Sequence, residues 1–384
     1  MTRVRMGLVG FGAAGTHHIE CVRRLGFVDV VAVASSNLAS TREKARRYGI
    51  PTVHLSYENL AADPSVEVIH NTTPNYLHAP VIRAALRHRK HIVSDKPLAT
   101  SASEARELLN EARTAGVVHA VTFHYRGSPL VREARLRIAR ADAGPVHFVQ
   151  GAYLQDWLLE DTDYSWRLDP VQSGPSCTVA DIGSHWCDLA EHVTGLRIEA
   201  VLANLDTVVK VRKKHLSPAK KAAVAQPDSL DAVKIETEDL ASALVRLNNG
   251  AMGCFSVGQV CAGHKNDVSL EVSCRNTSFR WQHGWHEQLW IGYRHRPNEV
   301  LPRERAGSRQ DETGSIESHG DGSDTSSDDL FHVLSEIYGR IVHRQSAGES
   351  AIVATFDDGY RINCIIDALL KSHADGNVWT RVNS

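Results

Sequence analysis

The feature that most constrains this chain is a glycine-rich segment that directly follows an apolar stretch near its beginning. Val4–Val9 has the apolar character of a buried strand. In a strand–turn–helix unit, the first glycine permits the tight turn, the second lets the backbone approach a diphosphate, and the third allows close packing. The anion then binds at the helix N-terminus, where N–H groups are free. We therefore predict a dinucleotide site rather than a purely structural turn, with contacts from Gly10, Phe11, Gly12, Ala13, Ala14 and Gly15.

The first third of the chain alternates short apolar runs with amphipathic stretches. Buried strands separated by helices are typical of a parallel sheet covered on both faces. We predict a doubly wound Rossmann domain over residues 1–124. Its strands are expected at Val4–Val9, Val28–Ala34, Val66–His70, His91–Val93 and Val117–Phe123, and its helices at His17–Leu25, Thr41–Tyr48, Leu77–Arg89 and Ser103–Ala115.

Beyond residue 125 the pattern changes to strands with few helices between them. A hairpin signal occurs at Asn248-Asn249-Gly250. We predict a second, α+β domain over residues 125–384, built on a large, mostly antiparallel open sheet. Helices are expected at Gly183–Val193 and at about Asp358–His373, the latter packing back. Two polar segments, Arg212–Pro227 and Arg303–Asp329, are predicted to be solvated loops.

Composition excludes several classes of protein. The formal net charge is −2, so nothing draws the chain toward nucleic acid or an anionic membrane. We find no apolar run long enough to span a bilayer and no signal-peptide layout. The seven cysteines are scattered singly, as in a cytosolic protein with reduced thiols. We expect a cytoplasmic enzyme without nucleic-acid or membrane partners, whose open sheet forms a homodimer or homotetramer.

The segment after the second predicted strand bears on the choice of cofactor. It reads Ser35-Ser36-Asn37, where an NAD-specific site usually carries Asp or Glu for the ribose 2′-hydroxyl. These neutral groups tolerate a 2′-phosphate, and Arg42 follows one or two helical turns later. Ser36 or Asn37 can equally serve as a helix N-cap. We predict that the chain binds NAD or NADP.

Two further strands end in polar segments that should meet at one edge of the sheet. The first ends in Asn71 and is followed by Thr72, Thr73, Pro74, Asn75 and His78, and the second ends in Ser94-Asp95-Lys96-Pro97. Ligands bind at the carboxyl ends of strands in open α/β sheets. We therefore predict that both segments contact the cofactor and that Lys96 points toward the same crevice as the glycine loop.

A later motif supplies a histidine with a nearby carboxylate. Asp181 and His185 are four residues apart, so a helix would place them on one face. Such a histidine is a competent general acid or base near neutral pH. A metal site is the alternative, but two ligands without a third nearby do not favour it, and we predict no metal.

Taken together, these motifs resemble those of the Gfo/Idh/MocA family of glucose–fructose oxidoreductases and inositol dehydrogenases. The resemblance rests on Gly10–His18, Thr73–His78, Asp95–Pro97 and Asp181–His185, in that order. It implies that Lys96, Asp181 and His185 are the catalytic residues. The chain departs from the family pattern at Asp95, where Glu is usual, at Gly174-Pro175-Ser176, and at His319–Gly322, a degraded substrate-side segment.

The resemblance also suggests which residues surround the reacting groups. We expect Trp166 and Arg167 beside the cofactor. Substrate contacts are expected from Tyr125, Arg126, Gln155, Asp156, Trp157 and His185. In this hypothesis His185 takes the hydroxyl proton, Lys96 stabilises charge on the reacting oxygen, and Asp181 binds a neighbouring hydroxyl or holds the catalytic groups.

The predicted activity is hydride transfer between a nicotinamide and a hydroxyl-bearing carbon of a sugar, glycoside or cyclitol. Two alternatives remain. A keto-sugar reductase of a biosynthetic pathway would use the same residues, since hydride transfer is reversible. A non-catalytic, dinucleotide-binding regulator would be expected to have lost the lysine or the histidine, and both Lys96 and His185 are present.

Overall fold

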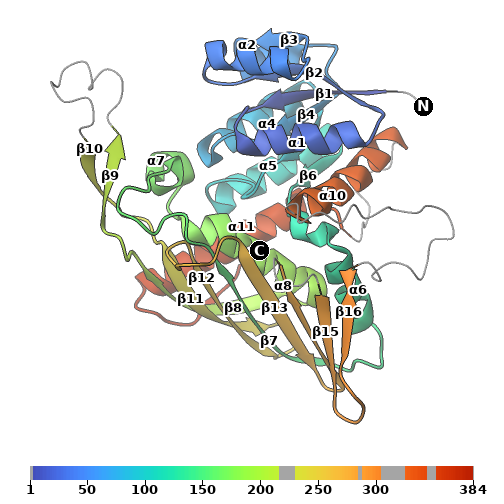
Figure 1. The fold of residues 1–384 in the computed structure, drawn as a ribbon, viewed down its shortest axis with the longest axis vertical. Coiled ribbons are helices and arrows are strands. Elements are labelled where there is room, and N and C mark those ends of the chain that lie inside the picture. The colour runs from blue at the N-terminus through green and yellow to red at the C-terminus, as the bar shows by residue number, and fades with distance from the viewer. Residues whose placement is uncertain (1–2, 216–229, 284–287, 304–324, 344–351, 384) are drawn as a thin grey trace.

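The glycine-rich segment joins β1 (Val4–Val9) to α1 (Ala13–Arg24), as the sequence predicts. The computed structural model describes residues 3–215, 230–283, 288–303, 325–343 and 352–383. Figure 1 shows a parallel sheet lying above a second, larger sheet, with α8 (Ser184–Thr194) and α11 (Phe356–Ala374) between them.

The first sheet has the doubly wound topology expected from the sequence. Its six parallel strands have the order β3-β2-β1-β4-β5-β6. The remaining strands are β2 (Val28–Ala34), β3 (Thr52–His54), β4 (Val68–Asn71), β5 (His91–Ser94) and β6 (His119–Val121). The helices are α2 (Leu38–Arg47), α3 (Tyr57–Ala62), α4 (His78–Arg87) and α5 (Ala102–Ala115). The sequence analysis missed β3 and α3, which are too short to show a clear period.

The second sheet has nine strands and is mostly antiparallel, which confirms the predicted fold class. Its order is β16-β15-β14-β13-β7-β12-β11-β8-β17, and β12 and β7 form its parallel pair. The strands are β7 (Val146–Leu154), β8 (Ile198–Asp206), β11 (Leu240–Leu247), β12 (Met252–Gly258), β13 (Asp267–Cys274), β14 (Thr277–Gln282), β15 (Gln288–Tyr293), β16 (Glu299–Pro302) and β17 (Thr380–Arg381).

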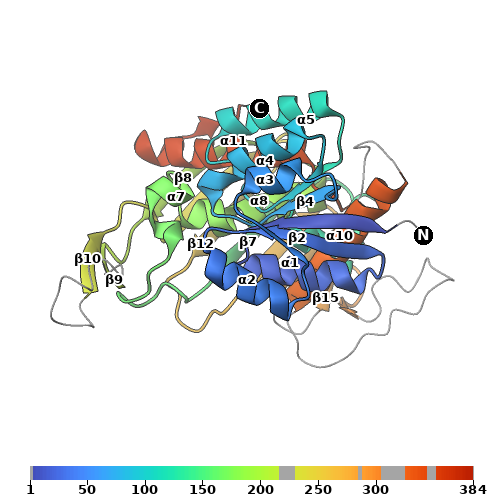
Figure 2. The same cartoon turned by 90° about the horizontal axis from the view of Figure 1, so that it is seen from above.

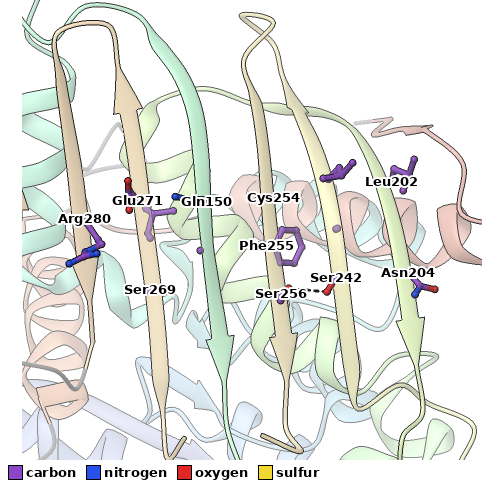
Figure 3. A pocket seen from close by; sticks show the side chains of 14 residues that line it. Gln150, Leu202, Asn204, Ser242, Cys254, Phe255, Ser256, Ser269, Glu271 and Arg280 are labelled. Carbon is purple, nitrogen blue, oxygen red and sulfur yellow. Dashed lines mark hydrogen bonds between the residues drawn. The ribbon is translucent and has the colours of Figure 1, made fainter. Parts of the chain in front are cut away.

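One face of this sheet is covered and the other is open. Helices α6 (Pro129–Ile138), α8 and α11 pack on the covered face. Figure 3 shows the open face, where a groove of about 480 Å³ runs over β7, β8, β11, β12, β13 and β14. Alternation along β11 exposes Leu244 while Val245 is buried. This open face is where self-association is predicted.

Helix α10 (Thr325–Val342) corrects one sequence prediction. The segment Arg303–Asp329 was expected to be a loop, but its last five residues form the start of this helix; residues 304–324, including His319–Gly322, lie outside the described chain. The helix packs on α1 and on the 3-10 turn η2 (His124–Gly127) through apolar residues at helical spacing. These are Leu330, Val333, Leu334, Ile337 and Tyr338, and the preceding Ser- and Asp-rich turn hid their period.

Arg212 corrects another prediction. It was placed in a solvated loop, but it lies in β9 (Val211–His215), which pairs with β10 (Leu230–Lys234). Its side chain is fully buried, with a 3.2 Å ion pair to Asp239 and hydrogen bonds to the carbonyl oxygens of Glu160 and Asp163. The basic run suggested a solvated loop, whereas a buried carboxylate and two carbonyl oxygens accept from the terminal nitrogens of this guanidinium. Residues 216–229 lie outside the described chain.

No helix within the described residues has the length and apolar character needed to cross a membrane. Figure 2 looks from above onto the first sheet and its helices, with strands of the second sheet behind them.

Candidate active site

A cavity of about 330 Å³ lies where the carboxyl ends of the parallel strands face the second sheet. Four parts of the chain contribute to its wall: α1, the segments after β5 and β6, the second sheet with its connections, and α10. The lining residues are Ala14, His17, His18, Asp95, Lys96, Thr122, His124, Tyr153, Gln155, Trp157, Arg167, Asp181, Ile182, His185, Asn266 and Leu330.

The glycine loop has the shape that a diphosphate requires. Gly10 has a φ of +92°, and a Cβ there would lie 2.6 Å from the Thr72 carbonyl oxygen. A Cβ on Gly15 would lie 2.3 Å from the Gly10 carbonyl oxygen. A Cβ on Gly12 would meet nothing within 4 Å, and no side chain caps the N-terminus of α1. The outer face of the loop and the first N–H groups of α1 are therefore free to receive an anion.

The end of β2 places the predicted Ser35 at the loop but a different cation from the one expected. The Ser35 hydroxyl accepts from Phe11 N–H at 3.5 Å, and Asn37 caps α2 by accepting from Ser40 N–H. Arg42 is exposed on α2. Lys44, about 200° further round the helix, donates from Nζ to the Phe11 carbonyl oxygen at 2.8 Å. The cation beside the loop is therefore Lys44 instead of Arg42.

The segments after β4 and β5 are tied to each other and to the loop. Thr72 donates from its hydroxyl to the Gly10 carbonyl oxygen at 2.7 Å. The ring nitrogens of His78 lie 2.7 Å and 2.9 Å from the carbonyl oxygens of Pro97 and Thr73. His78 and Thr72 therefore fix the positions of these segments. The amide of Asn75 donates to the Ser173 carbonyl oxygen at 3.0 Å, and Pro74 precedes the turn η1 (Asn75–Leu77).

Lys96 is held by one carboxylate at the floor of the cavity. Its Nζ donates to Asp181 Oδ1 at 2.7 Å and to the Asp181 carbonyl oxygen at 2.6 Å. An ammonium has three N–H donors, and the described residues accept two of them. Since Lys96 lines the cavity, the third donor is available to a ligand. Asp95, its neighbour, accepts from Thr122 at 2.8 Å.

Asp181 is committed on both oxygens. Arg167 Nε lies 3.2 Å from Oδ1, and Gln259 donates to Oδ2 at 2.8 Å. Burial opposes ionisation, but Arg167 and Lys96 hold the pKa of Asp181 well below its usual range. Asp181 therefore stays a carboxylate that anchors Lys96 and Arg167, and it is poorly placed to exchange protons.

His185 is one of four histidines that line the cavity, and the one that follows Asp181 on the same helical segment. It lies one turn beyond Asp181, after the π-helical turn η4 (Val179–Gly183), and is 4% exposed. Its Nδ1 is buried without a hydrogen-bond partner, and its ring centre is 4.9 Å from that of His124. Burial, followed by the positive field of Lys96, holds the pKa of His185 well below its usual value. The imidazole is therefore neutral near pH 7 and can accept a proton.

Neutral polar side chains form the wall opposite Lys96. Gln155 accepts from the Trp157 indole N–H at 2.8 Å and donates to Asn266 Oδ1 at 3.0 Å. Tyr153 donates to the same Asn266 oxygen at 2.6 Å. Gln259 donates to Gln155 at 3.3 Å, which connects this wall to Asp181. Of the predicted substrate contacts, Gln155, Trp157 and His185 line the cavity.

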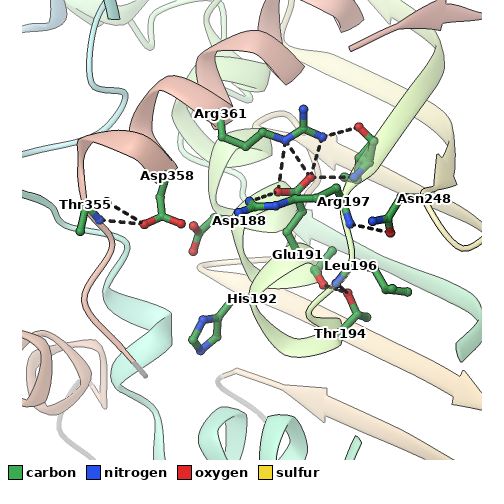
Figure 4. A network of polar contacts seen from close by, with 12 residues as sticks. Asp188, Glu191, His192, Thr194, Leu196, Arg197, Asn248, Thr355, Asp358 and Arg361 are labelled. Carbon is green, nitrogen blue, oxygen red and sulfur yellow. Dashed lines mark hydrogen bonds and ion pairs between the residues drawn. The ribbon is translucent and has the colours of Figure 1, made fainter. Parts of the chain in front are cut away.

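Three of the predicted substrate contacts, Tyr125, Arg126 and Asp156, do not line it, and neither does Trp166, which was expected beside the cofactor. Arg126 is buried against Asp188 and Asp358 behind α8, a cluster shown in part in Figure 4. Tyr125 bonds the Tyr153 hydroxyl at 2.9 Å from outside the cavity. Asp156 forms an ion pair with Lys265. The Trp166 ring lies against the Arg167 guanidinium, whose central carbon is 4.7 Å from the ring centre. Because charged partners satisfy Arg126 and Asp156 elsewhere, we remove both from the proposed substrate contacts.

Sequence reasoning missed several lining residues, above all three histidines. His17 and His124 each have a buried Nε2 without a hydrogen-bond partner, and burial lowers the pKa of His124 to about 3. His18 formed part of the glycine motif but received no role. With 21 histidines in the chain, no single one stood out. Within the described residues, no three His, Cys, Asp or Glu side chains are arranged to hold a metal ion.

Comparison with protein families matches two consecutive parts of the chain to one family. Residues 4–123 match the model described as "Oxidoreductase family, NAD-binding Rossmann fold". Residues 131–280 match the "GFO/IDH/MocA C-terminal domain". The two matches are consecutive: the first covers the parallel sheet, and the second ends within β14 of the larger sheet.

Among curated proteins, a levoglucosan dehydrogenase of Pseudarthrobacter phenanthrenivorans is 26% identical, over 97% of this chain and 97% of that protein. A D-xylose 1-dehydrogenase (NADP(+)) of Haloferax volcanii is 30% identical over 52% of this chain and 60% of its own length. A trans-1,2-dihydrobenzene-1,2-diol dehydrogenase of Sus scrofa is 32% identical over 50% of this chain and 56% of its own length.

Solved structures share the fold over the whole chain. A levoglucosan dehydrogenase in complex with NADH and L-sorbose has a TM-score of 0.86 at 24% identity, with full coverage of both chains. An oxidoreductase domain protein from Kribbella flavida has a TM-score of 0.88, also at 24% identity and with full coverage of both chains.

Proposed function

The chain belongs to the Gfo/Idh/MocA family of oxidoreductases, and from that premise we propose that it is an NAD(P)-dependent dehydrogenase of neutral sugars, glycosides or cyclitols. The reaction is hydride transfer at a secondary hydroxyl carbon. The observation that carries the proposal is that Lys96 and the neutral imidazole of His185 line the same cavity as α1, the helix that follows the glycine loop.

The residues of the first sheet fit a dinucleotide. The open face at Gly12 and the uncapped N-terminus of α1 suit a diphosphate, and Ser35 and Lys44 lie where the adenosine ribose would reach. Thr72, Thr73 and His78 support this edge of the sheet. When bound, the oxidised nicotinamide supplies the hydride acceptor.

The chain's own groups handle the proton and the charge. In the oxidation direction, His185 accepts the hydroxyl proton as the carbon–hydrogen bond breaks. Lys96 donates its third N–H to the reacting oxygen and stabilises the negative charge that develops there. Asp181 positions Lys96 and, as a fully hydrogen-bonded carboxylate, leaves the proton to His185.

The wall of the cavity favours an uncharged, polyhydroxylated substrate. Gln155, Asn266 and Tyr153 present neutral donors and acceptors. The two cations at the cavity, Lys96 and Arg167, are balanced by two carboxylates, Asp181 and Asp95. A sugar phosphate or sugar acid would bring a negative charge into the cavity, where both cations are already paired with carboxylates. The levoglucosan and xylose dehydrogenases among its relatives make anhydrosugars and aldoses the first substrates to test.

The reverse reaction, reduction of a keto-sugar, uses the same groups with His185 as the proton donor. We favour an enzyme over a non-catalytic regulator because both Lys96 and His185 line the cavity with neighbours that tune them.

The test is a substrate panel. Purified protein is incubated with NAD⁺ or NADP⁺ and with aldoses, anhydrosugars, glycosides and inositols, and absorbance at 340 nm is followed. Sugar phosphates and sugar acids serve as charged controls. We expect reduction of the cofactor with at least one neutral compound and slower turnover with its charged analogue. Absence of turnover with every compound, in both reaction directions, would contradict the proposal.

A further inference from the structure

Three buried polar side chains form a hydrogen-bonded chain from α10 to the active-site cavity. The Tyr338 hydroxyl lies 3.0 Å from His70 Nε2, and His70 Nδ1 lies 2.9 Å from His18 Nδ1. Tyr338 and His70 are fully buried, and His18 is 3% exposed. His18 lines the cavity with Asp95 and Lys96. The chain therefore connects a fully buried side chain of α10 with a side chain that lines the cavity.

The order of donors along this chain follows from counting protons. Among the described residues, His70 is the one recorded partner of the Tyr338 hydroxyl, so a buried phenol proton is satisfied when it is donated to His70 Nε2. A neutral His70 then carries its proton on Nδ1 and donates it to His18 Nδ1. His18 in turn carries its proton on Nε2. The reverse order would leave the phenol proton buried without an acceptor.

Burial keeps this arrangement in one protonation state. It lowers the pKa of His18 to about 4, lowers the pKa of His70 well below its usual value, and raises the pKa of Tyr338 well above its usual value. All three groups are neutral across physiological pH. His18 therefore presents a fixed Nε2–H donor, and among the described residues this N–H has no hydrogen-bond acceptor.

We propose that His18 is a cofactor-binding residue whose Nε2–H donates to the carboxamide oxygen of the nicotinamide, with His70 and Tyr338 as positioning residues. The proposal rests on the proposed NAD(P)-dependent function. His18 lies in the second turn of α1, beyond the uncapped first turn that suits the diphosphate. It shares the cavity with Lys96, where the hydride is transferred. A neutral imidazole N–H matches an uncharged amide oxygen, and this contact would fix the face of the ring that meets the substrate.

The test compares two ligands that differ in the nicotinamide. Dissociation constants for NADH and for ADP-ribose are measured by titration calorimetry with wild type, His18→Leu and Tyr338→Phe. If the wild type prefers the phosphorylated cofactor, NADPH and 2′-phospho-ADP-ribose are used instead. ADP-ribose retains the diphosphate and lacks the carboxamide, so its binding also reports whether each variant folds. Tyr360→Phe, which removes a phenol hydroxyl from the remote helix α11, is the matched control.

We expect His18→Leu to weaken NADH binding about ten-fold, as for the loss of one hydrogen bond to a group left unpaired, while ADP-ribose binds as to wild type. Tyr338→Phe should weaken NADH binding about two-fold, because His18 then populates both tautomers about equally, and Tyr360→Phe should have no effect. Unchanged NADH binding in His18→Leu, or equal loss of both ligands, would overturn the assignment. A wild type that binds ADP-ribose but neither reduced cofactor would overturn the proposed function itself.

The tautomer has its own readout. Long-range ¹H–¹⁵N spectra of wild type labelled at histidine should show His18 protonated on Nε2, with the signal assigned by its loss in His18→Leu. Protonation of His18 on Nδ1 would overturn the role of His70 and Tyr338.

Discussion

Two clusters of charged residues lie along one short segment, η4 and α8, and they differ in what they leave unpaired. At the start of the segment, Asp181 meets Lys96 and Arg167 at the cavity. About two to three turns later, Asp188 and Glu191 meet Arg126 and Arg361 away from it. Both clusters join α8 to other parts of the chain, and both contain the residue types of an active site.

The second cluster, shown without Arg126 in Figure 4, is closed: each of its charged side chains bonds another. Glu191 Oε1 accepts from Arg361 at 2.9 Å and from Ile198 N–H at 2.7 Å, while its other oxygen accepts from Arg197 at 2.8 Å. Asp188 bonds Arg126 with both oxygens, and burial raises its pKa to about 6. These pairs fasten α8 to η2, to β8 and to α11.

The cavity cluster is open by comparison. Lys96 retains one N–H donor, and the neighbouring His185 retains a buried nitrogen without a partner. What distinguishes the proposed catalytic cluster from the structural one is therefore an uncommitted donor or acceptor at the cavity. The number and kind of charges do not distinguish the two clusters.

The largest expected effect breaks the closed cluster. Arg126→Leu leaves Asp188 and Asp358 buried without their cation, which should lower the free energy of unfolding by about 3–5 kcal/mol. Chemical denaturation measures it, with the exposed Arg46→Leu as the control. A variant as stable as wild type would show that the closed cluster does not stabilise the fold.

The next effect concerns the open cluster. Lys96→Met removes the donor to the reacting oxygen, which should raise the barrier by roughly 3–4 kcal/mol, a loss of about 10²–10³-fold in kcat. NADH binding measured by fluorescence titration should stay close to wild type. Near-normal turnover of the true substrate would show that Lys96 does not act on the reacting oxygen.

The pH dependence sharpens the comparison at His185. Because its pKa is depressed, the neutral base persists below pH 6.5, so oxidation should stay fast there and fall only at lower pH, as the imidazole gains a proton. His185→Ala should lose about a hundred-fold in rate and lose this acid limb. The pH profile of kcat/KM measures it. An acid limb that survives in His185→Ala would point to another base.

The smallest effect concerns two cations on α2, of which one contacts the glycine loop and the other does not. Lys44 contacts the loop and Arg42 faces solvent. Lys44→Ala should weaken NADPH binding up to about five-fold relative to NADH, as for a partly exposed ion pair, and Arg42→Ala should not. Ser35→Asp should shift preference toward NADH through repulsion of the 2′-phosphate. Equal effects of both alanine variants in titrations would remove the distinction.

The sequence sufficed for the fold class because short apolar runs and glycine turns are local signals. The first two strands, Val4–Val9 and Val28–Ala34, have the bounds predicted for them. Lys96 and His185 were found because they follow recognisable motifs. What a motif cannot show is which neighbour satisfies a charge, since that depends on contacts between segments distant in sequence.

Arg126 and Arg42 illustrate that limit. Arg126 follows a strand that ends at the cavity, yet its guanidinium forms an ion pair away from the cavity with Asp358, which lies 232 residues later in the sequence. Arg42 and Lys44 are two residues apart on α2 and therefore lie on different faces of the helix. The sequence does not show which of these faces is turned toward the glycine loop. The Tyr338–His70–His18 chain was beyond prediction because it joins three elements across 268 and 52 residues.

The most direct test of the difference between the two clusters measures Lys96→Met and Arg126→Leu side by side. The quantities are kcat/KM per folded molecule, with a sugar that the wild type oxidises, and the midpoint of thermal unfolding. We predict that Lys96→Met unfolds close to wild type but has lost about 10²–10³-fold in kcat/KM, whereas Arg126→Leu unfolds at a lower temperature and keeps a kcat/KM close to wild type. Equal losses of kcat/KM in the two variants, or the larger loss in Arg126→Leu, would contradict the division into an open, catalytic cluster and a closed, structural one.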